Sequence, residues 1–223
     1  MLVDLDLARR GAPALSAERQ ATRDRLLAAA RMVFERDGFR KSRITDISHL
    51  GGLAHGGFYR YFDSKEAVLL ELAEAASERL GTPFDGVTFD SDSLDDLPDL
   101  LAAGIRRYLE VFRDEARILT LLGETGHQND RLRARSRDPR RPAVARHVEQ
   151  VRRLQRRGLV DARVSPEITV FALVGMLEQF AERWLVDGTV AGDLDVAVTQ
   201  LTRMCLHALR LDEPPRTPVT TRS

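Results

Sequence analysis

The sequence predicts an all-α fold in which a small N-terminal helix-turn-helix domain of three helices precedes a larger helical C-terminal domain. Apolar residues recur at helical spacing in one segment after another of the 223 residues. The composition, 43% hydrophobic and 30% charged, suits a folded helical protein and excludes wholesale disorder. Near the N-terminus, Gly51 and Gly52 separate two short apolar segments and predict a tight turn between two short helices.

The N-terminal part begins without sustained periodicity. Residues 1–20 contain Gly11 and Pro13, so we predict a flexible N-terminal arm. The first helix is predicted from Ala21 to Asp37, because an apolar stripe runs along this segment and Gly38 ends it. The stripe can cover the two short helices that follow, and it consists of Leu26, Ala30, Val33 and Phe34.

Two short helices joined by the glycine turn are predicted between Ser42 and Glu66. Ile44, Ile47 and Leu50 fall at three-residue spacing on one face of the first short helix. The second returns three apolar groups toward that face, namely Leu53, Phe58 and Phe62. This layout is that of a helix-turn-helix whose second helix enters the major groove of DNA.

The outward residues of the second short helix favour contact with DNA. His55 and Tyr59 share a face, and both side chains donate hydrogen bonds. Gly56 and Gly57 each cost about 1 kcal/mol relative to alanine inside a helix. The close approach of another backbone would explain why glycine stands at both positions.

A longer helix is predicted from Ser64 to Arg79, linking the helix-turn-helix to the rest of the chain. Ser64 is typical of an N-cap, whereas Lys65 in the first helical turn opposes the helix dipole. A DNA phosphate at this helix start would remove the conflict, because the free N–H groups and the ammonium would both face an anion.

This part of the chain resembles the DNA-binding domain of the TetR family of one-component transcriptional regulators. The resemblance begins at Thr22, includes L-L-A-A-A-R-M-V-F-E-R-D-G-F at 26–39 and I-T-D-I-S at 44–48, and continues through G-F-Y-R-Y-F-D-S-K-E at 57–66 to Leu72. It implies a transcriptional regulator, usually a repressor, in which the helix from Ser64 is the connector whose tilt changes the spacing of the two DNA-binding units.

The resemblance also implies which residues contact DNA. It assigns phosphate contacts to Tyr59, Tyr61 and Lys65. It assigns contacts with backbone or bases to Ser42, Arg43 and Thr45 at the start of the second helix, and to Ala54, His55 and Gly57 at the front of the third. The last three depart from the family pattern, in which Ser, Lys and Thr are common, so few side chains remain to read bases.

Four further helices are predicted after a break from Gly81 to Pro98. Helical spacing of apolar residues places them at about 97–123, 142–157, 165–188 and 193–211. Ser165-Pro166-Glu167 marks a helix start, with an N-cap, a proline at the first helical position and an acid in the first turn. The predicted domains are therefore the arm at 1–20, the DNA-binding domain at 21–80, a regulatory domain at 81–211 and a disordered tail at 212–223.

The last two predicted helices carry more apolar surface than a terminal hairpin needs. Ala172 and Gly175 permit close helix approach. We therefore predict a homodimer through these helices, as an isologous four-helix bundle, with packing inside one subunit as the alternative. A dimer can set two DNA-binding units about 34 Å apart on a palindromic operator in double-stranded DNA.

A ligand site is predicted among the middle helices, where large side chains occur with a few polar groups. This mixture is typical of a pocket for a small, largely apolar effector, and ordinary core packing is the alternative for each residue. The predicted ligand-binding residues are Tyr108, Phe112, Phe171, Gln179, Phe180 and Trp184.

Two arginine-rich segments have more than one interpretation. Residues 131–141 hold six arginines with Pro139, which fits a solvated surface, an anion site for a phosphate or carboxylate of the effector, or an auxiliary DNA contact. In the arm, Arg9 and Arg10 fit either a minor-groove contact or a solvated terminus.

Charge, cysteine content and motifs exclude several classes of protein. The formal net charge is zero, but residues 18–66 hold ten lysines and arginines against seven acids, and local charge governs DNA binding. The single cysteine, Cys205, excludes an internal disulfide, and we expect it to be a small buried apolar residue. No catalytic, metal or cofactor motif occurs, and no apolar run suits a membrane span or signal peptide, so we expect no cofactor, no metal and a cytoplasmic protein.

The sequence thus predicts a dimeric, ligand-responsive transcriptional regulator, a repressor by the resemblance, that binds a palindromic operator and is released by an unidentified effector. One alternative is a helical small-molecule-binding protein whose DNA-binding motif has lost operator specificity. Another, of a different class, is an all-α enzyme. Salt-dependent binding to random DNA, with or without preference for an operator, separates the three.

Overall fold

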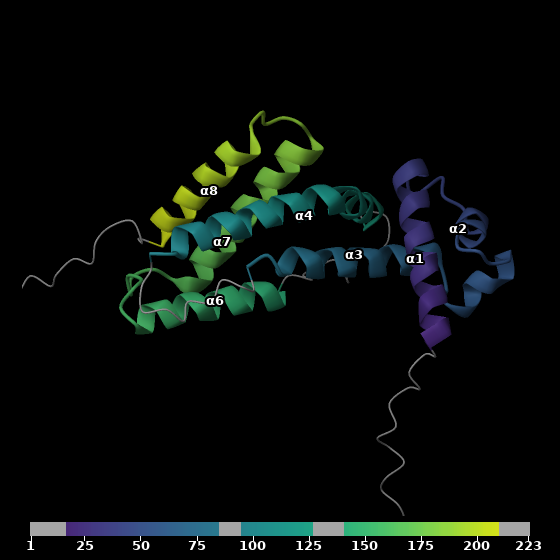
Figure 1. The fold of residues 1–223 in the computed structure, drawn as a ribbon, viewed down its shortest axis with the longest axis horizontal. Helices are drawn as coiled ribbons and strands as arrows, with labels where there is room; N and C mark the ends of the chain where they lie inside the picture. The colour runs from purple at the N-terminus through teal and green to yellow at the C-terminus, as the bar shows by residue number, and fades with distance from the viewer. Residues whose placement is uncertain (1–16, 85–94, 127–140, 210–223) are drawn as a thin grey trace, which may run out of the picture. The chain divides into compact units, whose positions relative to one another are not determined.

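The computed structural model describes residues 17–84, 95–126 and 141–209, and all regular secondary structure in these ranges is helical (Figure 1). The predicted all-α class is therefore confirmed. The chain forms two compact units: unit 1 extends to Leu72 and unit 2 begins at Ala73. Most of the arm, most of the break before residue 97, the arginines at 131–140 and the tail lie outside the described residues.

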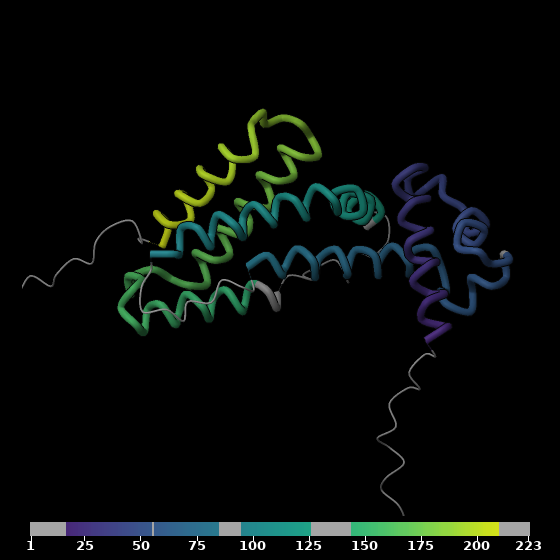
Figure 2. The backbone as a smooth tube through the Cα atoms, viewed as in Figure 1, coloured from purple at the N-terminus to yellow at the C-terminus, as the bar shows by residue number. Residues whose placement is uncertain are grey.

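Unit 1 contains α1 (Ala17–Asp37), α2 (Ile44–Leu50), the 3₁₀ helix η1 (His55–Arg60) and the first part of α3 (Lys65–Gly81). Figure 2 shows the chain turning back between α2 and α3 beside α1. Helix α1 begins at Ala17 and so includes residues predicted for the arm.

The core of unit 1 follows the predicted stripe of α1. Leu26, Ala30, Val33 and Phe34 are all buried, as are the apolar side chains of Ile47, Phe58, Phe62, Val68 and Leu69. Each buried apolar side chain of this size contributes about 1.5–3 kcal/mol to stability. Phe58 and Phe62 are both buried, which confirms that they point inward, and their ring centroids lie 5.8 Å apart.

The predicted apolar face of α2 is only partly correct. Ile47 is fully buried, but Leu50 is 47% exposed. Each step of three residues advances 300° around an α-helix, so the third member of a three-residue series has drifted well away from the face of the first. In a seven-residue helix this leaves one apolar residue to anchor α2 on α1.

Unit 2 contains α4 (Leu97–Gly126), α6 (Arg141–Arg156), α7 (Pro166–Ala181) and α8 (Leu194–Ala208), and a π-helical turn, η2 (Glu182–Val186), extends α7. Helix α4 packs against α8 and α7, and α6 packs against α7 (Figure 1). The predicted caps are present: Ser165 Oγ accepts from the N–H of Ile168, and Asp193 Oδ1 accepts from that of Asp195 at 2.7 Å.

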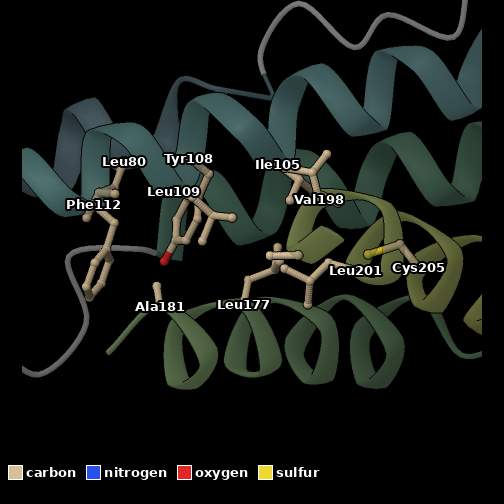
Figure 3. Packing of buried hydrophobic residues seen from close by; sticks show 11 residues of the cluster. Leu80, Ile105, Tyr108, Leu109, Phe112, Leu177, Ala181, Val198, Leu201 and Cys205 are labelled. Atoms are coloured by element: carbon tan, nitrogen blue, oxygen red, sulfur yellow. The ribbon is translucent and has the colours of Figure 1, made fainter. Parts of the chain in front are cut away.

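The main core of unit 2 lies between α4, α7 and α8. Figure 3 shows Ile105, Tyr108 and Leu109 of α4 directed toward Leu177 of α7 and toward buried residues of α8. The α8 residues labelled there are Val198, Leu201 and Cys205. A second, smaller cluster joins α6 to α7 through Val148, Val151, Leu154 and Val170.

One buried hydroxyl in α8 gives a prediction about stability. Thr202 Oγ1 is buried and has no hydrogen-bond partner among the described residues, which costs about 1–3 kcal/mol. Because valine has nearly the shape of threonine and a similar helix propensity, Thr202→Val is expected to raise the free energy of unfolding by about 1 kcal/mol. Urea denaturation measures this change.

The matched control lies one turn earlier on the same helix. Thr199 is exposed, and its hydroxyl donates to the carbonyl of Asp195 at 2.8 Å. Thr199→Val should therefore bring no gain. A loss of stability in Thr202→Val would mean that its hydroxyl has a partner in solution.

Candidate nucleic-acid interface and ligand cavity

The turn between α2 and η1 requires both of its glycines, for different reasons. Gly52 has φ +74°, in the left-handed region that L-residues avoid. A Cβ at Gly51 would lie 2.9 Å from Leu26 Cδ2 and 3.2 Å from the carbonyl oxygen of Ile47. The turn at Gly51 therefore lies close against Leu26 of α1.

The glycines of η1 are not required by the fold. A Cβ at Gly56 would meet no heavy atom within 4 Å, and one at Gly57 would make ordinary contact with Leu53. Neither has a positive φ. The local backbone therefore leaves room for side chains that the sequence does not provide.

This contrast predicts opposite effects of alanine on stability. Gly52→Ala is expected to lower the free energy of unfolding by about 1–2 kcal/mol, because alanine is strained at positive φ. Gly56→Ala is the matched control and should leave stability unchanged or raise it by up to about 1 kcal/mol. Thermal unfolding of both variants checks this, and a comparable loss in Gly56→Ala would contradict the open geometry at that residue.

The segment predicted as an α-helical reader is a 3₁₀ helix of six residues. Its N-cap, Ala54, makes no side-chain cap hydrogen bond, and the two glycines lower helix propensity further. Both facts favour the shorter, tighter helix. The side chain of His55 lies outside the described structure, so its predicted role stays a prediction.

Several residues predicted to contact DNA surround one groove of unit 1. The groove lies where the start of α2, the end of η1 and the start of α3 meet. Its lining includes the predicted residues Ser42, Arg43, Thr45, Tyr59 and Lys65. The others, Ala54, His55, Gly57 and Tyr61, do not line it.

The side chains differ in how far they reach solvent. Tyr59 is 54% exposed, with its ring edge-on to the buried ring of Phe58 at 5.6 Å. Arg43 and Thr45 are exposed, and Tyr61 is half-buried. Tyr59, Arg43 and Thr45 therefore present polar groups outward from a rigid core.

Lys65 and Ser42 both bind the carbonyl oxygen of Phe39. Lys65 Nζ donates to it at 2.8 Å and to the carbonyl of Ser42 at 3.3 Å, and the ammonium lies 4.5 Å from the centre of the Phe39 ring. Ser42 is buried, and its Oγ donates to the same carbonyl at 2.6 Å. The sequence predicts a DNA phosphate as the partner of the Lys65 ammonium. In the structure, two carbonyl oxygens of the loop after α1 accept hydrogen bonds from this ammonium.

This geometry changes the expected roles of two residues. The hydroxyl of Ser42 donates to the carbonyl of Phe39. We therefore expect Ser42 to position its neighbour Arg43 and not to contact DNA with its own side chain. Two donors of Lys65 are used within unit 1, and an ammonium has three. One donor therefore remains for an anion in the groove.

The groove also contains negative charge. Asp63 and Glu66 line it together with Arg43 and Lys65. Ser64 caps α3, accepting from the N–H of Ala67 at 3.2 Å, as the sequence predicted. Selectivity for an anion therefore depends on a few placed donors and not on a uniformly positive surface.

Unit 2 encloses a cavity of about 550 Å³. All its helices contribute to the lining, which is mainly apolar and includes Leu101, Leu119, Leu173 and Leu177. Cys205 also lines it, and burial raises the pKa of its thiol to about 11. The thiol is therefore protonated at neutral pH and serves as a small buried wall group, as expected from the sequence.

The cavity includes two of the six residues predicted to bind a ligand. Tyr108 and Phe112 line it, but Phe171, Gln179, Phe180 and Trp184 do not. Phe180 and Trp184 pack on each other, with ring centroids 5.6 Å apart, against the α4–α7–α8 core. Phe171 and Gln179 are exposed on the outer side of α7, because that helix is apolar on more than one face.

The last turn of α3 forms part of the cavity wall through Ser77, Leu80 and Gly81. Beside it, Arg79 Nε donates to the buried carboxylate of Glu115 on α4 at 2.8 Å. A ligand in the cavity would therefore touch the same helix that carries Lys65 at its start.

Large apolar side chains are exposed on both α7 and α8. Ile168 and Phe171 of α7 are 72% and 74% exposed, and Val196 and Met204 of α8 are also exposed. Gly175 lies on the same stripe of α7, with no heavy atom within 4 Å of a Cβ built on it. We define Ile168, Phe171, Gly175, Val196 and Met204 as the α7–α8 face.

Residues 17–84, 95–126 and 141–209 contain neither a membrane-spanning helix nor a metal-binding cluster. No helix there has the length and apolar character to cross a membrane. No group of three or more histidine, cysteine, aspartate or glutamate side chains there is placed to hold a metal ion.

Comparison with known proteins gives consistent similarities. A sequence model described as "Bacterial regulatory proteins, tetR family" matches residues 26–72. The chain is 25% identical to the HTH-type transcriptional regulator UidR of Escherichia coli K12 over 193 residues, covering 85% of this chain and 88% of UidR. It is 25% identical to the HTH-type transcriptional repressor BepR of Brucella suis over 206 residues, covering 87% of this chain and 94% of BepR.

The fold is also similar to solved structures. The fatty acid degradation regulator FadR from Bacillus halodurans superposes with a TM-score of 0.67 at 19% sequence identity, covering 85% of this chain and 96% of FadR. At this identity the likeness concerns the fold. None of these similarities is to an enzyme.

Proposed function

This chain belongs to the TetR family of transcriptional regulators, and from that premise we propose that it is a dimeric, ligand-responsive repressor. It binds a palindromic operator through unit 1 and is released by a small, largely apolar effector in the cavity of unit 2. The observation that carries the proposal is the groove of unit 1, where Arg43, Thr45, Tyr59 and Lys65 present donors from different helices to one open surface.

The proposed DNA contacts combine the family resemblance, which alone assigns Tyr61, with the exposure and bonding of the other side chains. The Tyr59 hydroxyl, the Tyr61 hydroxyl and the remaining donor of Lys65 bind phosphate oxygens. Arg43 and Thr45 extend from the start of α2 to backbone or base edges. Phosphate contacts set the register, and base contacts supply sequence preference.

The front of η1 lies in the major groove in this proposal. Ala54, Gly56 and Gly57 have small side chains or none, and the space at Gly56 is open. They allow the protein backbone to approach the DNA closely, while His55 offers a donor or acceptor to a base.

A second candidate is a DNA binder without operator preference. The uncapped 3₁₀ helix, with glycine at Gly56 and Gly57, favours it, because few side chains are available to read bases. Both candidates predict salt-dependent binding, and only the first predicts strong preference for one sequence.

Fluorescence anisotropy separates these candidates. Labelled DNA flanking the protein's own gene is titrated with the full chain at several salt concentrations, and random DNA of the same length serves as competitor. The operator proposal predicts a preference of at least about 10³. Equal affinity for both DNAs would favour the second candidate, and absence of binding to either would reject both.

Dimerisation is proposed through the α7–α8 face. Exposed apolar surface on two neighbouring helices is costly in water and suits a self-complementary bundle around a two-fold axis. The two DNA-binding units of the dimer then contact successive major-groove faces, about 34 Å apart.

Release by the effector is proposed to act through α3. A ligand that fits only one position of the last turn of α3 would favour that state and lower the affinity for DNA. The ion pair between Arg79 and Glu115 links the last turn of α3 to α4, so a movement of that turn also changes the geometry of the pair.

A further inference from the structure

A row of aromatic rings lines one wall of the cavity. The centroids of Phe112 and Tyr108 lie 6.1 Å apart, those of Tyr108 and Phe84 6.4 Å apart, and those of Phe84 and His147 5.6 Å apart. All these residues line the cavity. The faces of the phenylalanine and tyrosine rings carry partial negative charge and attract cations within about 6 Å.

Carboxylates also line this cavity, from two elements. Glu124 lies near the end of α4, and Glu178 lies one turn before the π-helical turn. Within that turn the N–H of Asp187 donates to the carbonyl of Glu182 at 3.1 Å. Residues five apart lie about 140° apart around an α-helix, but this i→i+5 bond brings Glu182 and Asp187 to one side, and both line the cavity.

Positive charge is scarce in the lining. Among the described residues that line the cavity there is no lysine or arginine. Asp187 accepts from Arg183 at 2.8 Å, and the other carboxylates of the lining are Glu124, Glu178 and Glu182. Glu178 is half-buried, whereas Glu124 and Glu182 are exposed, so these carboxylates repel an anionic ligand and attract a cationic one with the moderate strength of charges near a protein surface.

We propose that this cavity selects a lipophilic organic cation: an extended apolar or aromatic body that carries one positive charge, such as a quaternary ammonium or a protonated amine. The proposal rests on the ligand-responsive function above and adds the charge of the ligand. The apolar walls bury the body, the aromatic row and the carboxylates attract the charge, and the volume of about 550 Å³ lies in the usual range for small-molecule sites.

The sequence also gives a reason to consider an anionic ligand. Residues 131–140, which carry most of the arginine-rich stretch, lie outside the described residues, and one interpretation of them is an anion site. The experiment therefore compares ligands that share one apolar chain and differ only in the charge of the head group.

Three decyl compounds serve as probes: decyltrimethylammonium, decanoate and decyl alcohol, each below its micelle concentration. Binding to the full chain is followed by the fluorescence of Trp184, the single tryptophan, which packs against the core that adjoins the cavity. The cation is expected to bind at least about tenfold more tightly than decanoate.

Paired variants connect the preference to the carboxylates. Glu178→Gln with Glu182→Gln is expected to weaken binding of decyltrimethylammonium about tenfold and to leave binding of decyl alcohol unchanged. The control is Glu74→Gln, an exposed residue of α3 that does not line the cavity, and it should change neither.

The results that contradict the charge of the ligand differ from those that contradict the proposed function. Decanoate binding as tightly as the cation, or a cation preference that survives in the double variant, would overturn the charge assignment. In either case, release of operator DNA by any of the probes would still support the proposed function of a ligand-responsive regulator. If no probe binds, the cation proposal and the effector half of the proposed function both fail, while the anisotropy titration still decides DNA binding.

Discussion

Replacing Phe171 by lysine is expected to convert the proposed dimer into monomers. The phenyl ring is 74% exposed in the subunit and lies beside Ile168 and Gly175 on the α7–α8 face. Burying a phenylalanine side chain contributes about 1.5–3 kcal/mol, and an isologous interface contains the residue twice. The substitution also places two ammonium groups in an apolar contact. The dimer should weaken by at least about 3 kcal/mol, or about two orders of magnitude in Kd.

Sedimentation velocity over a range of concentrations measures this dissociation. Met32→Lys is the matched control, because Met32 is an exposed apolar residue of α1, outside the α7–α8 face, and its replacement should leave the dimer intact. A Phe171→Lys chain with the Kd of the unchanged protein would show that another surface forms the dimer. Operator affinity should fall with dimerisation in Phe171→Lys, since one DNA-binding unit makes half of the contacts.

Removing the ammonium of Lys65 is expected to weaken binding to every DNA sequence about equally. The Lys65→Ala variant would lose the proposed phosphate contact in each subunit of the proposed dimer, so the dependence of log K on log salt should flatten by about one unit per subunit. It also loses two hydrogen bonds to the carbonyls of Phe39 and Ser42, which should lower the stability of unit 1 by about 1–3 kcal/mol. Stability and DNA affinity are therefore measured together, at a temperature where the variant is folded.

The control for this variant is Arg113→Ala, which removes an exposed cation of α4 whose neighbour is Asp114, with the two charges 4.0 Å apart. It should leave the salt dependence unchanged. A loss confined to one operator base pair in Lys65→Ala would mean that Lys65 reads a base. An unchanged salt dependence with lowered stability would mean that its only role is to fasten the loop after α1.

The helix-turn-helix could be predicted because its local signals agree. Helical periodicity, the positive φ demanded at Gly52 and the capping residue Ser64 all point to the same layout, and the structure contains each of them. Ser165 and Asp193 likewise mark helix starts through their own side-chain hydrogen bonds. Such signals act within a few residues and are visible in sequence.

The ligand residues were harder to predict because α7 is apolar on more than one face. Leu177 points into the cavity, whereas Phe171 points to solvent. Periodicity identifies the helix but does not tell which face meets a ligand and which meets a second subunit. Tyr108 and Phe112 were predicted to line the pocket, and they share a single inward face of α4.

Features that depend on the path of the backbone could not be predicted. The carbonyl of Phe39 binds both Lys65 and Ser42 because the loop after α1 folds back on α3, and a backbone carbonyl has no sequence signature. The π-helical turn at Glu182–Val186, which helps bring Glu182 and Asp187 to the cavity, was likewise not apparent from the apolar pattern.

The most direct test of the account is a hydroxyl-radical footprint of the full chain on the DNA that flanks its own gene. We expect two protected patches on one face of the duplex, centred about one helical turn or about 34 Å apart and related by a palindrome. Because a Cβ at Gly56 would meet no heavy atom within 4 Å, Gly56→Ala is expected to leave the fold unchanged. It should weaken the protection of both patches together. Uniform protection that random DNA competes away equally well, or no protection at all, would contradict the claim that unit 1 reads an operator.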